Sequence, residues 1–428
     1  MNLLSEISPQ GGNFVPDQPG LPGVIDYVQD KAAALLTAPE FLRSASFALR
    51  RLRPTLVVAE FATVTRFADV VEVLENETFF RVVPVYAQAM LQTTGAFILG
   101  MDDRTRYEHE ATFLRSAVRT GDLEYLRELV ASRANELIAA ARGRGELDVA
   151  SGYAHEIALT VASQYFGVPG PDKGSMSRWM RTIFWDLFLN LTKRTSVTEL
   201  ARSAAAELNA YLERLVSELR VRLARDEDVP DDFLSRLVRA QGRFQIDDEG
   251  VRRNIGGLVV GAVETLSKAI VHAIDQLLRR PTVFAQASAA ALSGQTERVA
   301  AYAFEALRFN PHNPIIVRYC AEDFRLARGT TREAVIRAGT TTFASTLSGM
   351  FDASVLPSPH EFRIDRPWEH YLHFGRGMHR CFGERLNRVI IPQAVQALLA
   401  SQNLARLHGD AGRIHYEGPF PSQLLVKI

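Results

Sequence analysis

The sequence contains little cysteine, with only Cys320 and Cys381 among 428 residues. Two cysteines cannot build a disulfide framework, so we expect a reducing compartment and a cytoplasmic location. A disulfide between Cys320 and Cys381 is the alternative, and it would leave no free cysteine thiol that could ionise to a thiolate. Lysine plus arginine (49) equals aspartate plus glutamate (49), and this balance argues against a general nucleic-acid-binding protein, which needs a basic surplus.

Long apolar runs and the common nucleotide motifs are also missing. No run reaches 18 apolar residues, so we expect no membrane span, and residues 1–30 have no basic start followed by an apolar core, so we expect no signal peptide. There is no Walker A run, no H-E-x-x-H and no G-x-S-x-G. Gly375-Arg376-Gly377 lacks the third glycine of a dinucleotide loop. The chain therefore shows no flavin or nicotinamide site of its own.

The remaining composition is that of an ordinary globular protein, with 47% hydrophobic and 23% charged residues. Residues 1–24 are rich in proline and glycine and predict an extended lead, and no linker divides 25–428, so we expect a single domain. Periodicity predicts a mainly helical chain with a small β-rich part. Residues 82–101 fit either a loop or a buried helix. Helices are expected at about 24–36, 65–74 (capped by Thr65), 105–144, 153–166, 176–191, 197–225, 248–279, 296–308 and 388–400; strands at 55–61, 63–65, 315–319, 324–326, 340–346 and within 413–428.

The longest periodic segment, 248–279, is apolar on all sides, which is typical of a buried central helix. Gly261, Glu264 and Thr265 share one of its faces by their i, i+3, i+4 spacing. A glycine inside a helix costs about 0.5–1 kcal/mol relative to alanine, so this one needs a reason. The simpler interpretation is a threonine bonded back to its own helix beside a solvated glutamate.

The most informative stretch runs from Leu372 to Arg388 and surrounds Cys381 with glycines. Glycine lets a backbone approach a flat cofactor closely, and the amides at a helix start favour an ionised sulfur. These features have a use if Cys381 is a metal-bound thiolate, since a thiolate on haem iron, for example, donates electron density that favours O–O cleavage. The alternative is a buried structural cysteine beside a glycine turn.

The run from Phe374 to Gly383 resembles the haem-binding loop of the cytochrome P-450 family, F-G-x-G-x-H-x-C-x-G, at every fixed position. The resemblance implies a P-450 fold, mainly α with a small β-rich subdomain, and haem b with Cys381 as the axial thiolate. It also implies that Glu264 and Thr265 relay protons, although Ala262 and Leu266 depart from the family's commoner residues. The implied cofactor-binding residues of the loop are Phe374, Gly375, Gly377, His379 and Gly383.

The resemblance extends to three charged sites. Glu305, Arg308 and Arg366 match a buried network that holds the cysteine loop, and Arg318 and His379 match partners of the haem propionates. The family's third propionate contact, a His and an Arg four residues apart on an early helix, is broken here, because Arg106 and Glu110 occupy those positions. Arg106 or His109 is left as the candidate substitute.

The resemblance implies a monooxygenase that activates dioxygen with electrons from a ferredoxin or flavodoxin and oxidises an apolar or aromatic small molecule. The electron donor would dock on a basic patch. The alternatives are a peroxide-using or hydroperoxide-rearranging haem-thiolate enzyme and a non-catalytic haem-binding sensor. The patch comprises Arg376, Arg380, Arg385 and Arg388, and family topology suggests a pocket of Phe97, Phe184, Phe188, Val260, Ile315 and Phe420.

Overall fold

A single long helix, α11 (Asp248–Leu278), runs through the middle of the computed structural model, which describes residues 39–190 and 193–428. The Asp247 side chain caps its start by accepting a hydrogen bond from the Gly250 amide at 2.8 Å. Most of its residues are buried, as the all-round apolar pattern predicted. The helix is long and apolar enough to cross a membrane, but 78% of its most apolar window is buried inside the protein, which is the behaviour of a core helix.

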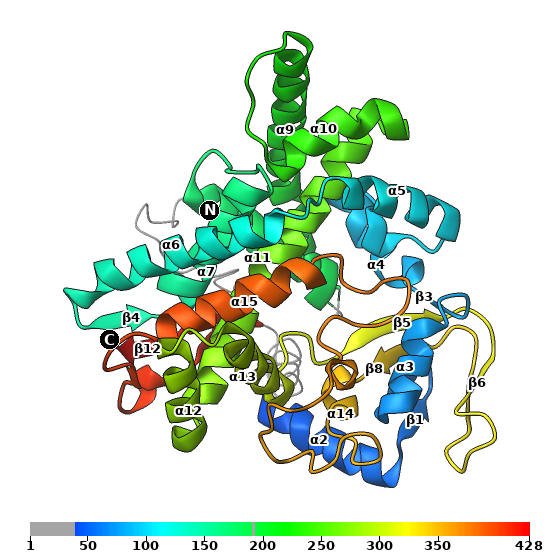
Figure 1. Ribbon diagram of the computed structural model, residues 1–428. Helices are drawn as coiled ribbons and strands as arrows, with labels where there is room; N and C mark the ends of the chain where they lie inside the picture. Colours follow the sequence, from blue (N-terminus) through cyan, green and yellow to red (C-terminus); the bar gives the residue numbers. More distant parts are fainter. Residues whose placement is uncertain (1–38, 191–192) are drawn as a thin grey trace.

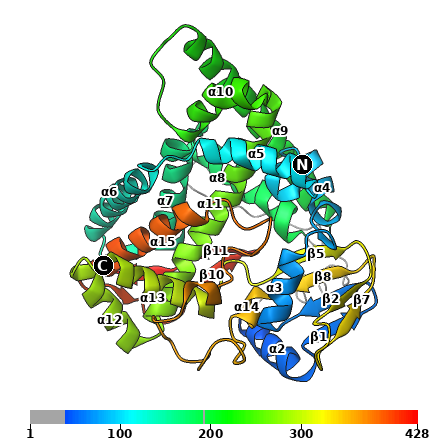
Figure 2. The same ribbon diagram turned by 45° about the vertical axis from the view of Figure 1, so that its right-hand side comes forward.

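Most of the helices between residues 150 and 310, together with the last long helix, pack against α11 and form the larger part of the molecule (Figures 1 and 2). Each of the long helices α6 (Asp122–Arg142), α9 (Thr195–Ala224) and α15 (Glu384–Leu399) buries a row of apolar residues, and α9 projects from the body together with α10 (Phe233–Phe244). The helices are α2 (Pro39–Leu52), α3 (Phe67–Glu75), α4 (Val83–Gln92), η2 (Ile98–Gly100), α5 (Arg104–Ser116), α6 (Asp122–Arg142), η3 (Ala150–Ala154), α7 (His155–Thr160), η4 (Val161–Tyr165), α8 (Lys173–Phe184), η5 (Trp185–Leu189), α9 (Thr195–Ala224), α10 (Phe233–Phe244), α12 (Pro281–Leu292), α13 (Thr296–Phe309), α14 (Thr346–Gly349), η6 (Trp368–His370), α15 (Glu384–Leu399) and η7 (Asp410–Gly412).

A smaller β-rich part lies beside α2, α3 and α14, at the lower right of Figure 1. Its main sheet has the order β1-β2-β8-β5-β3, with β2 and β8 parallel and the other neighbours antiparallel. Smaller sheets pair β4-β12-β9, β6-β7 and β10-β11. The strands are β1 (Thr55–Val58), β2 (Phe61–Val64), β3 (Phe80–Arg81), β4 (Glu146–Asp148), β5 (Ile316–Cys320), β6 (Phe324–Leu326), β7 (Ala334–Ile336), β8 (Thr341–Ala344), β9 (Ala405–Arg406), β10 (His415–Glu417), β11 (Phe420–Gln423) and β12 (Leu425–Lys427).

The architecture confirms the predicted fold class, and the local errors have simple causes. Thr65 does not cap α3: its hydroxyl donates to the Pro54 carbonyl at 2.7 Å, and the helix begins at Phe67 behind Arg66. The ambiguous stretch 82–101 contains a helix, α4, rather than only a loop. Helices α2, α10 and α12 were not predicted, and α15 begins at Glu384 instead of Arg388. The predicted lead and the helix at 24–36 lie outside the described residues.

Candidate cofactor site around Cys381

Cys381 lies in a tight loop directly before α15. Its amide donates to the Phe374 carbonyl at 2.8 Å, and the Arg380 amide donates to the Gly377 carbonyl at 3.1 Å, so the loop is closed by its own backbone. The thiol is free and half-buried. Burial raises its pKa to about 11, while the amides of Gly383 and Glu384 at the helix start oppose that rise. A bound metal ion would remove the thiol proton outright, and those two amides would then face a thiolate.

The glycines of the loop serve different purposes. Gly375 (φ 69°) and Gly377 (φ 70°) both have left-handed backbones that favour glycine. At Gly377 a β-carbon would overlap the Leu74 carbonyl oxygen, so the loop packs directly against the end of α3. Gly383 has an ordinary φ of −79°, and a β-carbon there would lie 3.9 Å from the Cys381 sulfur. Gly377 is therefore required by packing, whereas Gly383 keeps the space beside the sulfur open.

Phe374 is buried at the start of the loop among other aromatic rings. Its ring centroid lies 6.1 Å from those of Phe304 on α13 and Trp368 on η6. Offset or edge-to-face aromatic pairs at this separation are favourable. The loop is thus attached to the helical part by Phe374 and to α3 by Gly377.

Arg318 and His379 provide the clearest test of whether these residues fit a haem. Arg318 on β5 is 5% exposed, and its only hydrogen bond to a described residue goes to the Val317 carbonyl at 2.9 Å. Both ring nitrogens of His379 are buried without a hydrogen-bond partner in the described part of the chain. Burial and then the nearby Arg318 charge lower the pKa of His379 to about 3. A buried cation that forms no ion pair with a described carboxylate, beside an imidazole without a partner in the same part of the chain, is suited to the propionate groups of a haem.

The structure gives the two early-helix candidates other neighbours. Arg106 is exposed and donates to Glu110 at 3.1 Å, and His109 is exposed with its ring 6.4 Å from that of Phe244 on α10. The α5 residue that reaches the cysteine loop is Tyr107, which sequence reasoning missed. Its hydroxyl donates to the Met378 carbonyl, and its ring packs edge-on against His379 at 5.4 Å.

Glu110, which replaces the family's arginine, accounts for the altered pattern on α5. It is buried and binds Arg253 and Asn254 of α11, the latter at 2.6 Å. Burial alone would raise the pKa of Glu110, but the hydrogen bonds from Arg253, Asn254 and Arg106 lower it. The position that supplies a cation in relatives therefore holds α5 against the central helix here.

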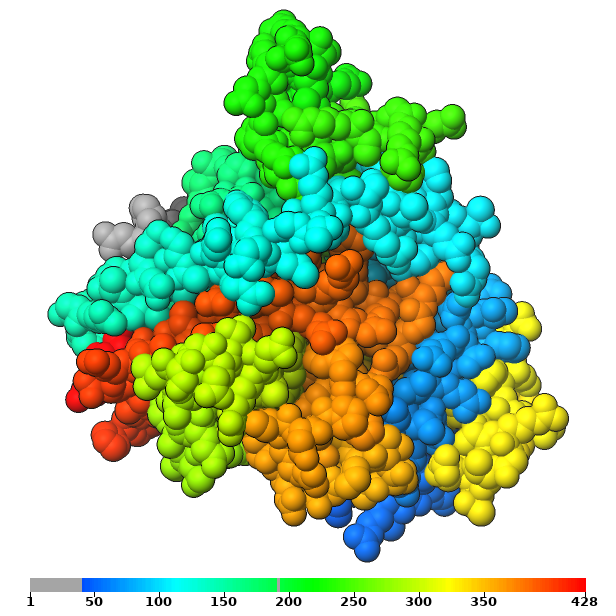
Figure 3. Space-filling view, viewed as in Figure 1, coloured from blue at the N-terminus to red at the C-terminus, as the bar shows by residue number. Residues whose placement is uncertain are grey.

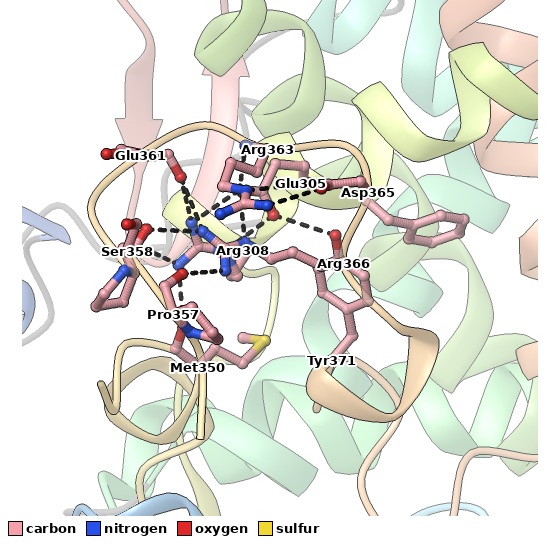
Figure 4. A network of polar contacts seen from close by, with 12 residues as sticks. Glu305, Arg308, Met350, Pro357, Ser358, Glu361, Arg363, Asp365, Arg366 and Tyr371 are labelled. Atoms are coloured by element: carbon pink, nitrogen blue, oxygen red, sulfur yellow. Dashed lines mark hydrogen bonds and ion pairs between the residues drawn. The ribbon is translucent and has the colours of Figure 1, made fainter. Parts of the chain in front are cut away.

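The predicted charge network is assembled as expected and is larger than expected (Figure 4). Glu305 accepts hydrogen bonds from Arg308 at 2.8 and 2.9 Å and from Arg366 at 3.2 Å. It also accepts one from the Arg363 amide at 2.9 Å and one from the Tyr371 hydroxyl at 3.1 Å.

Arg308 is fully buried and donates further hydrogen bonds to the carbonyls of Met350 and Pro359, at 3.0 and 2.8 Å. The network joins α13 to the segment that leads into the cysteine loop.

In the middle of α11, from Asn254 to Leu277, the half-buried residues form one stripe on an otherwise buried segment: Gly261, Ala262, Thr265 and Lys268. A β-carbon at Gly261 would meet nothing within 4 Å, so the stripe faces open space. The Thr265 hydroxyl donates back to the Gly261 carbonyl at 2.7 Å. The threonine therefore bonds back to its own helix, as the simpler interpretation of the sequence predicted. That interpretation also predicted a solvated glutamate, but Glu264 is buried (3% exposed).

Three of the six pocket candidates form one aromatic group. Phe184 lies 4.9 Å from Phe188 and 6.1 Å from Phe420, measured between ring centroids, so the end of α8, η5 and β11 meet there. Phe97 is fully buried against Gly257 of α11, where a β-carbon would overlap its ring. Val260 is buried on the next turn of α11, and Ile315 is half-buried just before β5.

Comparison with known proteins agrees with this geometry. The family model described as cytochrome P-450 matches residues 58–425. The chain belongs to the cytochrome P-450 family. Members of this family carry a haem whose iron is ligated by a cysteine thiolate, and the donor set found here fits that cofactor: Cys381 for the iron, with Arg318 and His379 for the propionates.

Two similar curated proteins come from bacterial secondary metabolism. Cyclomarin C epoxidase of Salinispora arenicola is 31% identical over 280 residues, which cover 64% of this chain and 65% of that protein. Mycinamicin IV hydroxylase/epoxidase of Micromonospora griseorubida is 27% identical over 78% of this chain and 80% of the relative. Among solved structures, that of CalO2 superposes with a TM-score of 0.79 at 23% identity, covering 92% of this chain and 98% of CalO2, and supports the fold.

Proposed function

We propose that this protein is a haem-thiolate monooxygenase that inserts one oxygen atom of dioxygen into an apolar or aromatic small molecule. The second oxygen atom leaves as water, which consumes two electrons and two protons. Haem supplies the oxygen-activating chemistry. The observation that carries the proposal is the open stripe on α11, where Gly261 leaves space and Thr265 presents a hydroxyl one residue after the buried Glu264.

The chain's own residues would divide the work as follows. Cys381 holds the iron, and the buried Arg318 and His379 bind the negative groups at the cofactor's edge. Glu264 holds a proton at a carboxylate oxygen, and the Thr265 hydroxyl passes protons between that carboxylate and the open space. The aromatic group of Phe184, Phe188 and Phe420 excludes water and favours an apolar substrate. The two relatives named as an epoxidase and a hydroxylase/epoxidase support the oxygen-inserting reaction.

Electrons would come from an acidic ferredoxin or flavodoxin that docks beside the cysteine loop, in the cytoplasm. The surface there is formed largely by residues 350–390, in orange tones in Figure 3. Arg385 and Arg388 are exposed on the first turns of α15, and the Arg388 guanidinium lies 4.2 Å above the Trp368 ring. Arg380 donates a hydrogen bond to Glu384 at 2.6 Å, and this carboxylate partly neutralises its positive charge. Complementary charge of this kind accelerates docking and loses strength with salt.

The test begins with a small-molecule library screened for ligand-induced shifts of the haem spectrum, which identifies a substrate. Turnover of that substrate is then compared with a ferredoxin and ferredoxin reductase system and with hydrogen peroxide alone. We expect ferredoxin-driven turnover that falls with rising salt. Turnover with peroxide and none with ferredoxin or flavodoxin would instead establish the peroxide-using alternative, and ligand binding with neither oxidant would favour a sensor.

The relay has its own variant. Replacing Thr265 with alanine should lower dioxygen-driven turnover on the order of 100-fold, the usual contribution of a positioned proton donor, while peroxide-driven turnover persists. Thr160→Ala is the matched control, because Thr160 also bonds back to the carbonyl four residues earlier, at 2.9 Å, but lies on α7. Equal activity of the Thr265 variant and the native enzyme would refute the relay.

A further inference from the structure

Two carboxylates from different parts of the chain compete for one guanidinium, that of Arg181 on α8. Arg181 donates a hydrogen bond to Glu417 on β10 at 3.2 Å, whereas its Nε lies 3.8 Å from Oε1 of Glu264 on α11. The Arg181 guanidinium also sits 5.3 Å above the ring of Phe420 on β11. The β10-β11 hairpin thus contacts Arg181 at two points and takes its hydrogen bond.

Glu264 is left with weak partners on the same side. Its Oε1 lies 3.5 Å from the His155 ring on α7, but this oxygen accepts no hydrogen bond within the described residues, although it is buried. Lys268 follows four residues later on α11 and attracts Glu264 without an ion pair within 4 Å among the described residues. A buried carboxylate normally has a hydrogen-bonded cation, so this arrangement requires an explanation.

We propose that Glu417 is a positioning residue for proton delivery, which holds Arg181 on the C-terminal hairpin and thereby keeps the guanidinium out of hydrogen-bonding distance of Glu264. This inference rests on the proposed function, in which Glu264 carries protons. A carboxylate that passes protons must be protonated during each cycle. A guanidinium bonded directly to it would favour the ionised form, so a smaller fraction of the enzyme would hold the proton.

The surrounding charges are consistent with this division. Burial raises the pKa of Glu417, and only the Arg181 charge opposes that rise. Burial lowers the pKa of Lys268 to about 8, with the Glu264 charge acting against it. Among the described residues, the titratable groups that face Glu264 are His155, Arg181 and Lys268, and Glu417 is the carboxylate that accepts the Arg181 hydrogen bond.

The decisive variant is Glu417→Gln, which keeps the shape of the side chain and removes the charge that attracts Arg181. We expect the guanidinium to turn to Glu264. In the haem-loaded protein, selectively labelled with carbon-13 at glutamate carboxyls and held in its diamagnetic ferrous carbon monoxide form, the Glu264 carboxyl should then titrate at lower pH than it does in the native protein. Its resonance is identified by its loss in Glu264→Gln. Dioxygen-driven turnover should fall about tenfold, and its alkaline limb should move to lower pH, while peroxide-driven turnover is unchanged.

Two further variants separate positioning from general loosening. Glu417→Asp keeps the charge and should restore most of the native titration and turnover. Glu207→Gln is the matched control. Glu207 accepts a hydrogen bond from Arg178, one turn earlier on α8, at 3.2 Å between Nη1 and Oε1, and within the described residues it forms no hydrogen bond or ion pair with Arg181. An unchanged Glu264 titration in Glu417→Gln, or equal effects of the Glu207 and Glu417 variants, would overturn the inference.

Failure of the relay itself gives a different pattern. If Glu264→Gln leaves dioxygen-driven turnover unchanged, the proposed proton relay is wrong. The carboxyl titration still decides whether Glu417 controls the pairing of Arg181 with Glu264, because that measurement does not depend on turnover.

Discussion

Replacing Glu305 with glutamine tests the charge network that supports the cysteine loop. Glu305 and Arg308 are both 0% exposed, and Arg366 also binds the same carboxylate. Glutamine removes the negative charge and turns an NH₂ group toward arginine N–H or tyrosine O–H donors. Removing one member of a buried ion pair costs about 3–5 kcal/mol, which is a large fraction of the about 5–15 kcal/mol that stabilises a typical protein.

The assay is urea unfolding of the haem-loaded protein, followed by both haem absorbance and far-ultraviolet circular dichroism, because a cofactor-bound protein need not unfold in two states. We expect Glu305→Gln to lower the unfolding free energy by about 3–5 kcal/mol and to release haem at lower urea. The matched control is Asp365→Asn, which breaks the exposed pair with Arg363 at 2.7 Å in the same segment and should leave the midpoint unchanged.

A milder variant keeps the prediction testable if Glu305→Gln does not fold. Tyr371→Phe removes one hydrogen bond to the Glu305 carboxylate, of 3.1 Å, and should cost about 1.5–3 kcal/mol, the usual contribution of a hydrogen bond to a charged group. A loss below about 1 kcal/mol in both variants would contradict the reasoning, since it would mean that the buried arginines do not depend on this carboxylate.

Two other predictions concern the loop and the buried histidines. Gly377→Ala should lower haem content and stability more than Gly294→Ala, because the two glycines have nearly equal φ (70° and 68°) but only the first would place a β-carbon against backbone. Equal losses would show that the positive φ alone matters. Lowering the pH from 6.5 toward 4 should reduce the unfolding free energy, because burial depresses the folded-state pKa of His312 to about 4 and of His373 to about 3, so the unfolded chain binds more protons in that window. Each histidine contributes about 1.4 kcal/mol per pH unit, and urea midpoints of His312→Gln should show a flatter dependence on pH.

The parts of the site that sequence could predict are those encoded within a short stretch. Cys381 and the glycines around it follow one another along the chain, and Glu305 and Arg308 lie three residues apart on one helix. Tyr371 and Tyr107 were missed because their contacts join residues 66 and 271 positions apart. A tyrosine without a local motif gives no sign of such a partner.

The fold shows the same division between local and distant information. The all-round apolar pattern of α11 was sufficient to predict a core helix, whereas α12, P-T-V-F-A-Q-A-S-A-A-A-L, is rich in alanine and lacks a sharp apolar face. The alternatives at 82–101 could not be separated, because α4 has only one buried residue, Met90. Both elements depend on packing against neighbours for their stability, as most protein helices do.

The position of Cys381 depends on contacts with both parts of the molecule. Gly377 brings the loop against α3 in the β-rich part, while Tyr371 and Arg366 connect the segment before it to Glu305 on α13 in the helical part. Arg318 on β5 and the stripe on α11 belong to these same two parts. A change in how the β-rich part packs on the helices would therefore move Cys381, Arg318 and the α11 stripe relative to one another. This is a reason for a buried charge network at a place where an apolar core would cost less.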